Sequence, residues 1–276
     1  MTMRWGIAAV VALLIAALAG CGSSSSGSTT PSGQMVLATT TSTRDTGLLD
    51  TLVPAFQRAS KCSVKTVAVG SGQAIDLGAR GQADVLLVHS PDAEQTFMQQ
   101  GHGESRLAVM HNDFVLVGPP GDPAKTAGAG GIVPALKAIA RSESPFASRA
   151  DDSGTNAKEL KLWQEAGITP GGAWYIKTGQ GMGPTLTIAS QKRAYTLSDR
   201  GTYLATKNLD SKILVQGGKE LQNFYHVIVV KHDGTNVGCA HAFARWITSP
   251  PAQRLIGGFG TSKYGQPLFH PDAPAQ

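Results

Sequence analysis

Three short turns combine hydroxyl side chains or glycines with the start of a predicted helix. They span residues 39–43, 70–73 and 152–155. The first backbone N–H groups of a helix have no partner inside it, and the helix dipole adds positive potential there. Hydroxyl groups beside those amides can donate further hydrogen bonds, so an anion is the natural ligand of several such turns that converge. Each turn alone is explained more simply as a helix cap.

An arginine, Arg149, stands just before the third turn. Its guanidinium is permanently charged and presents several donors in one plane, which suits an oxyanion. A single arginine near a turn is more often a surface ion-pair residue. The arginine therefore strengthens the case for an anion site only if the turns come together.

The motifs of common enzymes are absent from the sequence. It has no Gly-x-Ser-x-Gly elbow, no nucleotide-binding Walker loop and no His-Glu-x-x-His pair. No histidines are paired at i, i+4 with a carboxylate, so a metal cation site is unsupported. The glycines at 179–183 lack the spacing of a dinucleotide loop. We expect a protein that is not an enzyme and needs no cofactor, with an exported hydrolase as the alternative from another class.

The composition narrows the class of protein. The chain has 276 residues, of which 41% are hydrophobic and 16% charged, so a disordered chain is excluded. The formal charge is +5, but the basic residues are scattered and aromatic residues make up only 6%. Nucleic-acid binding is therefore not expected.

Strands and helices alternate along the chain, which favours α/β lobes with mainly parallel sheets flanked by helices. Ligands bind such sheets at the carboxyl ends of the strands, and two facing lobes form a cleft. A breaker, Gly-Pro-Pro-Gly at 118–121, separates two halves. We expect lobe I at 34–117 plus 220–276 and lobe II at 118–219. Strands are predicted at 36–38, 64–69, 84–88, 114–117, 146–149, around 204, at 213–215 and at 227–230, and helices from about 48, 74, 91, 132, 158, 240 and 252.

The N-terminus has the features of an export signal. Arg4 precedes an apolar run at 7–18 that is too short for a comfortable membrane span. Residues 18–21, Leu-Ala-Gly-Cys, resemble a bacterial lipobox, although an ordinary signal with a chance cysteine is the alternative. We expect a signal peptide at 1–20, lipidation at Cys21, and a Ser/Gly-rich flexible linker at 21–33. The protein would then be exported and anchored to the outer side of the cell membrane.

Two cysteines, Cys62 and Cys239, remain for the folded part of the chain. An exported compartment permits a disulfide between them, and neither lies in a metal-binding spacing. A bridge and two buried thiols are both open alternatives.

Several stretches together resemble the tungstate-binding proteins of ABC-type uptake systems, which are relatives of the molybdate- and phosphate-binding proteins. These stretches run in family order over essentially the whole mature domain. They are TTTSTRDTGLLD at 39–50, AVGSGQA at 68–74, ADVLLVHSP at 83–91, NDFVLVGP at 112–119, SRADDSGTNAKEL at 148–160, GQGMGPTL at 179–186 and YTLSDRGTYL at 195–204.

The resemblance implies a two-lobed type II periplasmic-binding-protein fold with tungstate held in the interlobe cleft. It implies partners as well: an ABC permease and its ATPase subunits, with a monomeric binding protein. Molybdate or phosphate is the alternative ligand. Carried over by position, the ligand-binding residues are Thr40, Thr41, Ser42, Ser71, Arg149, Ser153, Gly154 and Thr155, with a lesser contribution from Gly181 and Met182.

The two acidic residues beside Arg149 decide which oxyanion fits. Tungstate has no proton to donate near neutral pH, whereas a carboxylate acceptor in the pocket would favour protonated phosphate. We predict that Asp151 and Asp152 brace the turn and Arg149, and that they do not face the ligand.

Overall fold

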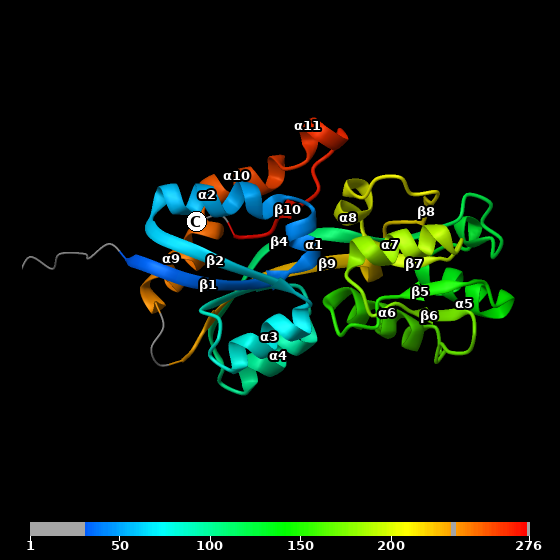
Figure 1. Cartoon of the computed structure of the whole chain (residues 1–276), viewed down its shortest axis with the longest axis horizontal. Helices are drawn as coiled ribbons and strands as arrows, with labels where there is room; N and C mark the ends of the chain where they lie inside the picture. Colours follow the sequence, from blue (N-terminus) through cyan, green and yellow to red (C-terminus); the bar gives the residue numbers. More distant parts are fainter. Residues whose placement is uncertain (1–30, 233–235, 275–276) are drawn as a thin grey trace, which may run out of the picture.

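Two lobes, each a β-sheet with helices packed on it, make up the structure (Figure 1). The structure is a computed structural model, and it describes residues 31–232 and 236–274. The predicted signal peptide and Cys21 lie outside the described residues, as does the predicted linker up to residue 30. Strand β1 begins at Ser32, so residues 32 and 33, predicted as the end of the linker, belong to the sheet.

Lobe I is built on a six-stranded path in the order β10-β4-β9-β3-β1-β2. Strands β1, β2 and β3 run parallel, while β9 runs antiparallel to β3 and to β4. Helices α2, α9 and α10 cover one face of this sheet, and α3 and α4 cover the other (Figure 1). The bounds are β1 Ser32–Thr40, β2 Lys61–Val69, β3 Val85–Val88, β4 Gly103–Gly118, β9 Gln222–Val230, β10 His270–Pro271, α2 Leu48–Ala59, α3 Ser71–Ala79, α4 Pro91–Gln99, α9 Val237–Ile247, α10 Pro250–Gly258 and α11 Thr261–Tyr264.

The core of lobe I follows from its sequence pattern. Strand β3 consists of Val-Leu-Leu-Val, and all four residues are buried, as expected for a strand with helices on both faces. In α2 the buried residues Leu48, Leu49, Leu52 and Phe56 recur at helical spacing and face the sheet.

Lobe II is organised around the second half of β4. There β4 pairs antiparallel with β7 and β8, while β5 and β6 pair in parallel beside them. A bridge between Phe146 and Tyr195 joins β5 to the start of β7, also in parallel. The bounds are α5 Ile132–Ser142, β5 Phe146–Ser148, α6 Gly154–Glu165, β6 Tyr175–Lys177, α7 Met182–Gln191, β7 Thr196–Asp199, α8 Arg200–Ala205 and β8 Lys212–Val215.

The chain crosses between the lobes inside two long strands, β4 and β9. Phe114 and Leu116 already lie in the core of lobe II, and Phe114 pairs with Asp199 of β7. Leu221 lies in the same core, and β9 begins at the next residue. The lobes therefore meet near Phe114 and Gln222 and not at 117/118 and 219/220, because the breaker at 118–121 ends β4 only after the strand has entered lobe II.

Two other predictions of local structure are corrected. Leu204 belongs to α8 and not to a strand, because Asp199 caps a short helix there through the amide of Thr202. Residues 103–113, predicted as no element, form the first half of β4.

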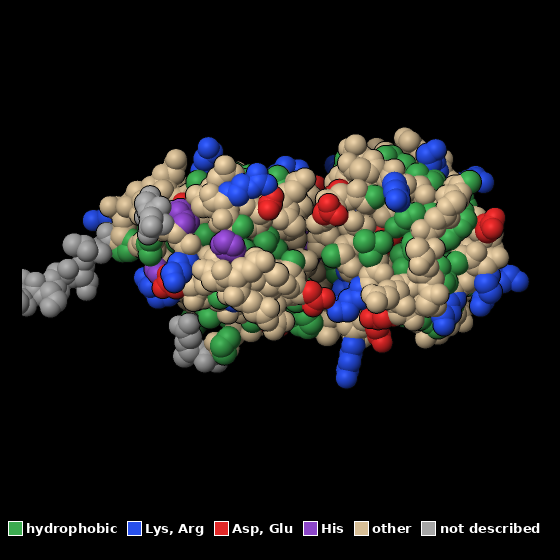
Figure 2. All heavy atoms as spheres, turned by 90° about the horizontal axis from the view of Figure 1, so that it is seen from below, with side chains coloured by type: hydrophobic (Ala, Val, Ile, Leu, Met, Phe, Trp, Pro, Cys, Tyr) green, Lys and Arg blue, Asp and Glu red, His purple; other side chains and the backbone are tan. Residues whose placement is uncertain are grey.

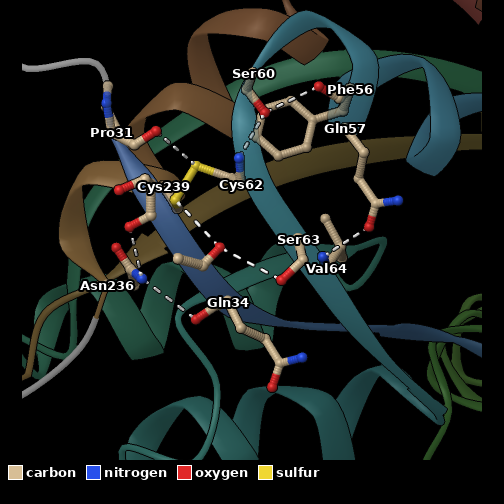
Figure 3. Close-up of a disulfide and its surroundings, with 12 residues drawn as sticks. Pro31, Gln34, Phe56, Gln57, Ser60, Cys62, Ser63, Val64, Asn236 and Cys239 are labelled. Carbon is tan, nitrogen blue, oxygen red and sulfur yellow. Dashed lines mark hydrogen bonds between the residues drawn. A yellow bond between two sulfur atoms is a disulfide. The ribbon is translucent and has the colours of Figure 1, made fainter.

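The structure joins Cys62 to Cys239 by a disulfide (Figure 3). Cys62 lies near the start of β2, the edge strand of lobe I, and Cys239 lies in the first turn of α9. Both residues are buried in the core of lobe I. The bridge thus connects the N-terminal sheet to the C-terminal helices, across 177 residues of sequence.

The surface of the molecule narrows where the lobes meet (Figure 2). Over residues 31–232 and 236–274, no helix is both long and apolar enough to cross a membrane.

Candidate oxyanion-binding site

The candidate residues of lobe I lie where strands end and helices begin. Thr40 is the last residue of β1 and caps α1 (Thr41–Asp45), and Ser71 is the first residue of α3, two residues after β2 ends. Because β1 and β2 are parallel neighbours, their carboxyl ends meet at one edge of the sheet. That edge faces lobe II.

The candidate residues of lobe II have the same arrangement. Arg149 directly follows β5, Ser153 caps α6, and Gly181 precedes α7. Strand β5 runs parallel to β6 and to the start of β7, so the carboxyl ends of these strands lie at the same edge of the lobe II sheet. The local chemistry of strand ends and caps therefore places donors on both lobes.

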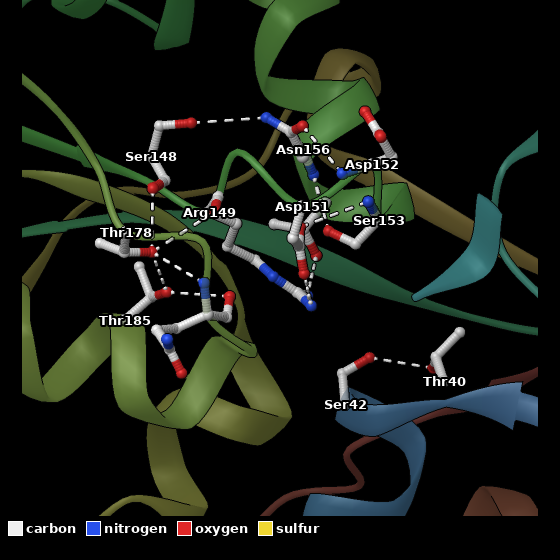
Figure 4. Close-up of polar contacts among 12 residues, drawn as sticks. Thr40, Ser42, Ser148, Arg149, Asp151, Asp152, Ser153, Asn156, Thr178 and Thr185 are labelled. Atoms are coloured by element: carbon white, nitrogen blue, oxygen red, sulfur yellow. Dashed lines mark hydrogen bonds and ion pairs between the residues drawn. The ribbon is translucent and has the colours of Figure 1, made fainter. Parts of the chain in front are cut away.

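The turns of the two lobes touch each other, so the expected convergence occurs. A Cβ on Gly70 would stand 3.3 Å from the Cα of Ser153, and one on Gly181 would stand 3.7 Å from the Oγ1 of Thr41. Figure 4 shows Thr40 and Ser42 of lobe I opposite the Arg149 turn of lobe II. The candidate residues of all four segments thus surround one region between the lobes.

Arg149 is the positive charge of this region, and it is buried with an exposed fraction of 3%. Its Nη2 donates to the Oδ2 of Asp151 at 2.6 Å, and its Nη1 lies 3.4 Å from the Oγ1 of Thr155. Its Nε is buried and has no hydrogen-bond partner among the described residues. A guanidinium with a free buried N–H is a donor in need of an acceptor.

Asp151 braces Arg149 and the turn, as predicted. Its Oδ2 accepts from Arg149, and its Oδ1 accepts from the backbone N–H of Ser153 at 3.3 Å (Figure 4). Asp152 is exposed, and its backbone N–H donates to the Oδ1 of Asn156. The Asp151 carboxylate therefore braces the turn and orients the arginine, while Asp152 contributes to the turn through its backbone N–H.

Two hydroxyl groups in the site are buried and lack a hydrogen-bond partner among the described residues. They are the Oγ1 of Thr41 and the Oγ of Ser71, one on α1 and one on α3. Leaving a buried polar atom unpaired costs about 1–3 kcal/mol. Ser42 and Ser153 are buried too, but their hydroxyls bond to Thr40 and to the amide of Asn156. Thr41 and Ser71 are both residues carried over as ligands, and Asp199, beside the site, also has a buried oxygen without a partner among the described residues, its Oδ1.

The remaining donors are backbone amides. Ser153 accepts from the amide of Asn156, which leaves the amides of Gly154 and Thr155 at the first two positions of α6. The first amides of any helix have no partner inside it, and in α3 and α7 no side-chain cap takes them up. Such amides and the buried guanidinium form a donor-rich region suited to an anion.

A histidine that sequence reasoning missed, His89, lies against the site. It directly follows β3, and its Nδ1 lies 2.9 Å from the Oδ1 of Asn223 on β9. Burial, and next the charge of Arg149, lower the pKa of His89 to about 3. The imidazole is therefore neutral. The position of His89 at the end of a predicted strand could have marked it as a site residue. Its hydrogen bond to Asn223 could not be predicted, because the two residues are 134 positions apart in sequence.

The lowered pKa makes His89 a source of acid sensitivity. Above pH 6.5 both the folded and the unfolded chain carry a neutral imidazole, so His89 contributes no pH dependence there. Below 6.5 the unfolded chain binds a proton that the folded protein does not, so stability falls by about 1.4 kcal/mol per pH unit until the folded pKa near 3 is reached. We expect urea unfolding of the wild type to lose about 2 kcal/mol more than His89→Gln between pH 7 and pH 5. Equal losses in the two proteins would contradict this assignment.

A second missed residue is Asp199, at the carboxyl end of β7. It is buried, and its Oδ2 accepts from the amide of Thr202 at 2.7 Å. Burial raises the pKa of this carboxyl, whereas the Thr202 hydrogen bonds and the charge of Arg149 act in the opposite direction. The role visible in the structure is that of a helix cap beside the site.

A metal centre is a poor alternative for this region. Within the described residues, no group of three or more histidine, cysteine, aspartate or glutamate side chains is placed to hold a metal ion. The site also holds the permanent positive charge of a buried guanidinium, which has no acceptor atom and repels a metal cation.

Comparison with known proteins identifies the family. A family model described as a PBP superfamily domain matches residues 24–251. The chain is 48% identical over 278 residues to the tungstate-binding protein TupA of Peptoclostridium acidaminophilum, an alignment that covers 97% of each chain. It is 47% identical over 249 residues to a putative ABC transporter anion-binding protein of Haloferax volcanii, covering 87% of this chain and 72% of that one.

A solved structure gives the same result in three dimensions. The tungstate ABC transporter structure from Geobacter sulfurreducens superposes with a TM-score of 0.76 at 43% identity, covering 82% of this chain and 98% of that one. Two of these three relatives are named for tungstate, and the third is named for an anion.

Proposed function

Because the chain belongs to the PBP superfamily and, within it, to the tungstate-binding proteins of ABC transporters, we propose that it captures tungstate between its lobes and delivers it to a membrane permease. One observation carries the proposal: a buried arginine with a free N–H and two buried, unpaired hydroxyls lie together where the lobes meet. Tungstate would give each of these donors an acceptor.

The charge and shape of tungstate match this set of donors. The ion is a tetrahedral dianion that only accepts hydrogen bonds near neutral pH. Arg149 supplies a charge-assisted contact, the stronger kind of hydrogen bond, and the hydroxyls and amides supply the rest. Both carboxylate oxygens of Asp151 are occupied by Arg149 and Ser153. Monohydrogen phosphate brings a proton that needs an acceptor in the pocket, whereas Asp151 is oriented toward Arg149 and Ser153, which favours the unprotonated ion.

Molybdate is the rival ligand within the same class, because it presents nearly the same tetrahedron of oxygens. The choice of tungstate rests on the two relatives that are named for it. An exported hydrolase is disfavoured because Ser71 and Thr41 lack an adjacent general base, which a nucleophile requires.

Transport follows from closure of the lobes around the ion. A ligand that contacts both lobes stabilises the closed form by its differential affinity for it. A permease that recognises the closed form would then receive loaded protein, with the energy of transport coming from ATPase subunits. Lipidation at Cys21 would keep a monomeric protein beside that permease.

The direct test is calorimetric titration of the purified protein with tungstate, molybdate, sulfate and phosphate. We expect tight binding of tungstate, weaker binding of molybdate, and no measurable binding of sulfate or phosphate. Preference for phosphate would overturn the assigned ligand, and turnover of a phosphoester would overturn the assigned class.

Removing the hydroxyl of Ser71 should lower the affinity for tungstate without lowering the stability of the protein. Within the part of the chain that the structure describes, this hydroxyl has no hydrogen-bond partner, so Ser71→Ala should leave the thermal stability of the unliganded protein unchanged or slightly raised. In the complex it would lose a hydrogen bond to a charged group, about 1–2 kcal/mol or a factor of roughly 5–30 in affinity. Ser63→Ala, on the exposed face of β2, is the matched control. Unchanged tungstate affinity of Ser71→Ala would contradict a ligand role for this residue.

A further inference from the structure

Two glycines, one on each lobe, lie where the lobes approach each other closely. Gly72 is the second residue of α3 in lobe I, and a Cβ there would stand 2.7 Å from the carbonyl oxygen of Asp152 in lobe II. Gly154 is the first residue of α6 in lobe II, and a Cβ there would stand 2.7 Å from the carbonyl oxygen of His89 in lobe I. Both contacts cross from one lobe to the other.

The atoms facing these glycines cannot easily move aside. Each is a backbone oxygen, and a Cβ closer than 3.0 Å forces a shift of one side or the other. The imidazole of His89 also lies against Gly154, with its Cε1 2.8 Å from the position of a Cβ. That ring is buried and hydrogen-bonded to Asn223, so it has little freedom. A methyl group at either glycine would therefore push the lobes apart.

Small separations matter because the donors come from both lobes. Thr41 and Ser71 approach from lobe I, and Arg149 approaches from lobe II. Charge-assisted hydrogen bonds to an oxyanion are about 2.7–2.9 Å long. A gap of about 0.5–1 Å already removes a quarter to a half of a packing contact. It would also stop one ion from reaching both sets of donors.

We propose that Gly72 and Gly154 are positioning residues that set oxyanion affinity by letting the lobes close to hydrogen-bonding distance, with no side chain of their own at the ligand. The inference rests on the proposed function, since it assumes that the ligand bridges the lobes. Gly72 and Gly154 would thus contribute to the affinity although neither has a side chain that can donate a hydrogen bond.

Alanine is an informative substitution at both positions. Neither glycine has a backbone angle in the left-handed region, so alanine fits the backbone. Alanine also keeps the amide N–H and has a higher helix propensity than glycine. If these residues acted only as amide donors or as helix residues, the substitutions would leave binding unchanged. If they act by close approach, binding weakens although every donor remains.

The experiment compares Gly72→Ala, Gly154→Ala and the double variant with Gly171→Ala. Gly171 is the control because it is exposed, and a Cβ there meets nothing within 4 Å. Calorimetry with tungstate should show about 5- to 150-fold weaker binding for each single variant and wild-type binding for the control, as expected for one overpacked methyl group. The melting temperature without ligand should change little, because separation of the lobes relieves the contact without disturbing the core of either lobe.

A distance measurement tests the same idea without relying on binding. Fluorescent labels on exposed Lys65 of β2 and Lys137 of α5, each replaced by cysteine, report the separation of the lobes. We expect a longer distance in the alanine variants than in the wild type, with and without tungstate. Unchanged affinity together with an unchanged distance would overturn the proposal. A wild type that binds none of the four ions would overturn the proposed function, and the label distance would then decide the role of the glycines alone.

Discussion

Arg149→Ala should weaken tungstate binding by about 2–4 kcal/mol, which is roughly 30- to 1,000-fold in the dissociation constant. The guanidinium is buried, so its attraction for a dianion is only weakly screened by water and salt. Its Nε has no hydrogen-bond partner among residues 31–232 and 236–274, which leaves a donor for the ligand. Calorimetric titration of the variant and the wild type measures the difference.

Two further variants separate charge from geometry at this position. Arg149→Lys keeps the charge but loses the planar set of donors, so we expect an intermediate affinity. In Arg149→Ala, Asp151 is left as an unpaired carboxylate that would itself repel a dianion. The double variant Arg149→Ala with Asp151→Asn removes that repulsion and should bind somewhat more tightly than Arg149→Ala alone.

The control for nonspecific charge effects is Arg80→Ala. Arg80 forms an exposed ion pair with Asp76 at the far end of α3, so its loss should change affinity by less than about twofold. An affinity of Arg149→Ala within twofold of the wild type, with the fold intact, would show that the arginine does not contact the ligand.

Loss of the disulfide should be the largest effect on stability, about 2–5 kcal/mol in the free energy of unfolding. The bridge closes a loop of 177 residues between β2 and α9, so it restricts the unfolded chain strongly. Urea unfolding of the double variant Cys62→Ser with Cys239→Ser, compared with the wild type, measures the loss. The double variant Cys62→Ala with Cys239→Ala is the control for burying two hydroxyls in the lobe I core.

Tungstate affinity should survive loss of the bridge. Cys62 lies near the start of β2 and the site lies beyond its end, so about eight residues of extended strand, roughly 25 Å, separate them. A wild-type unfolding midpoint in both double variants would contradict a stabilising role for the disulfide. Lost tungstate binding in a variant that remains folded would show that the disulfide supports the binding site as well as the stability of lobe I.

The elements that could be predicted are those with a strong apolar pattern. Helices α2 and α5 have large apolar faces, and β3 is a continuous apolar run, so spacing alone indicated them. The first half of β4 mixes buried and exposed residues and lies next to the short edge strand β10, so its pattern is weak. Helix α7 begins Met-Gly-Pro-Thr, and glycine and proline have low helix propensity. The start of this helix is therefore not recognisable from its sequence pattern.

The candidate site could be predicted in part, because its components are local. A strand end, a hydroxyl and a helix start are adjacent in sequence at Thr40, Ser71 and Ser153, and each turn has the expected structure. His89 and Asn223 could not be paired in this way, since their contact joins residues 134 apart. The close approach of Gly72 to Asp152 depends on how two lobes fit together.

The sequence by itself determined the type of donor, the arginine, the two-lobed architecture and the family resemblance, because caps, turns and apolar spacing are encoded over a few neighbouring residues. Only the tertiary structure decided that the turns converge, that Asp151 is engaged by Arg149, that His89 is neutral and that Cys62 and Cys239 are joined. The physical reason is that burial, electrostatic shifts and close contact depend on distances between residues far apart in the chain. Those distances exist only once both sheets have formed and the lobes have met.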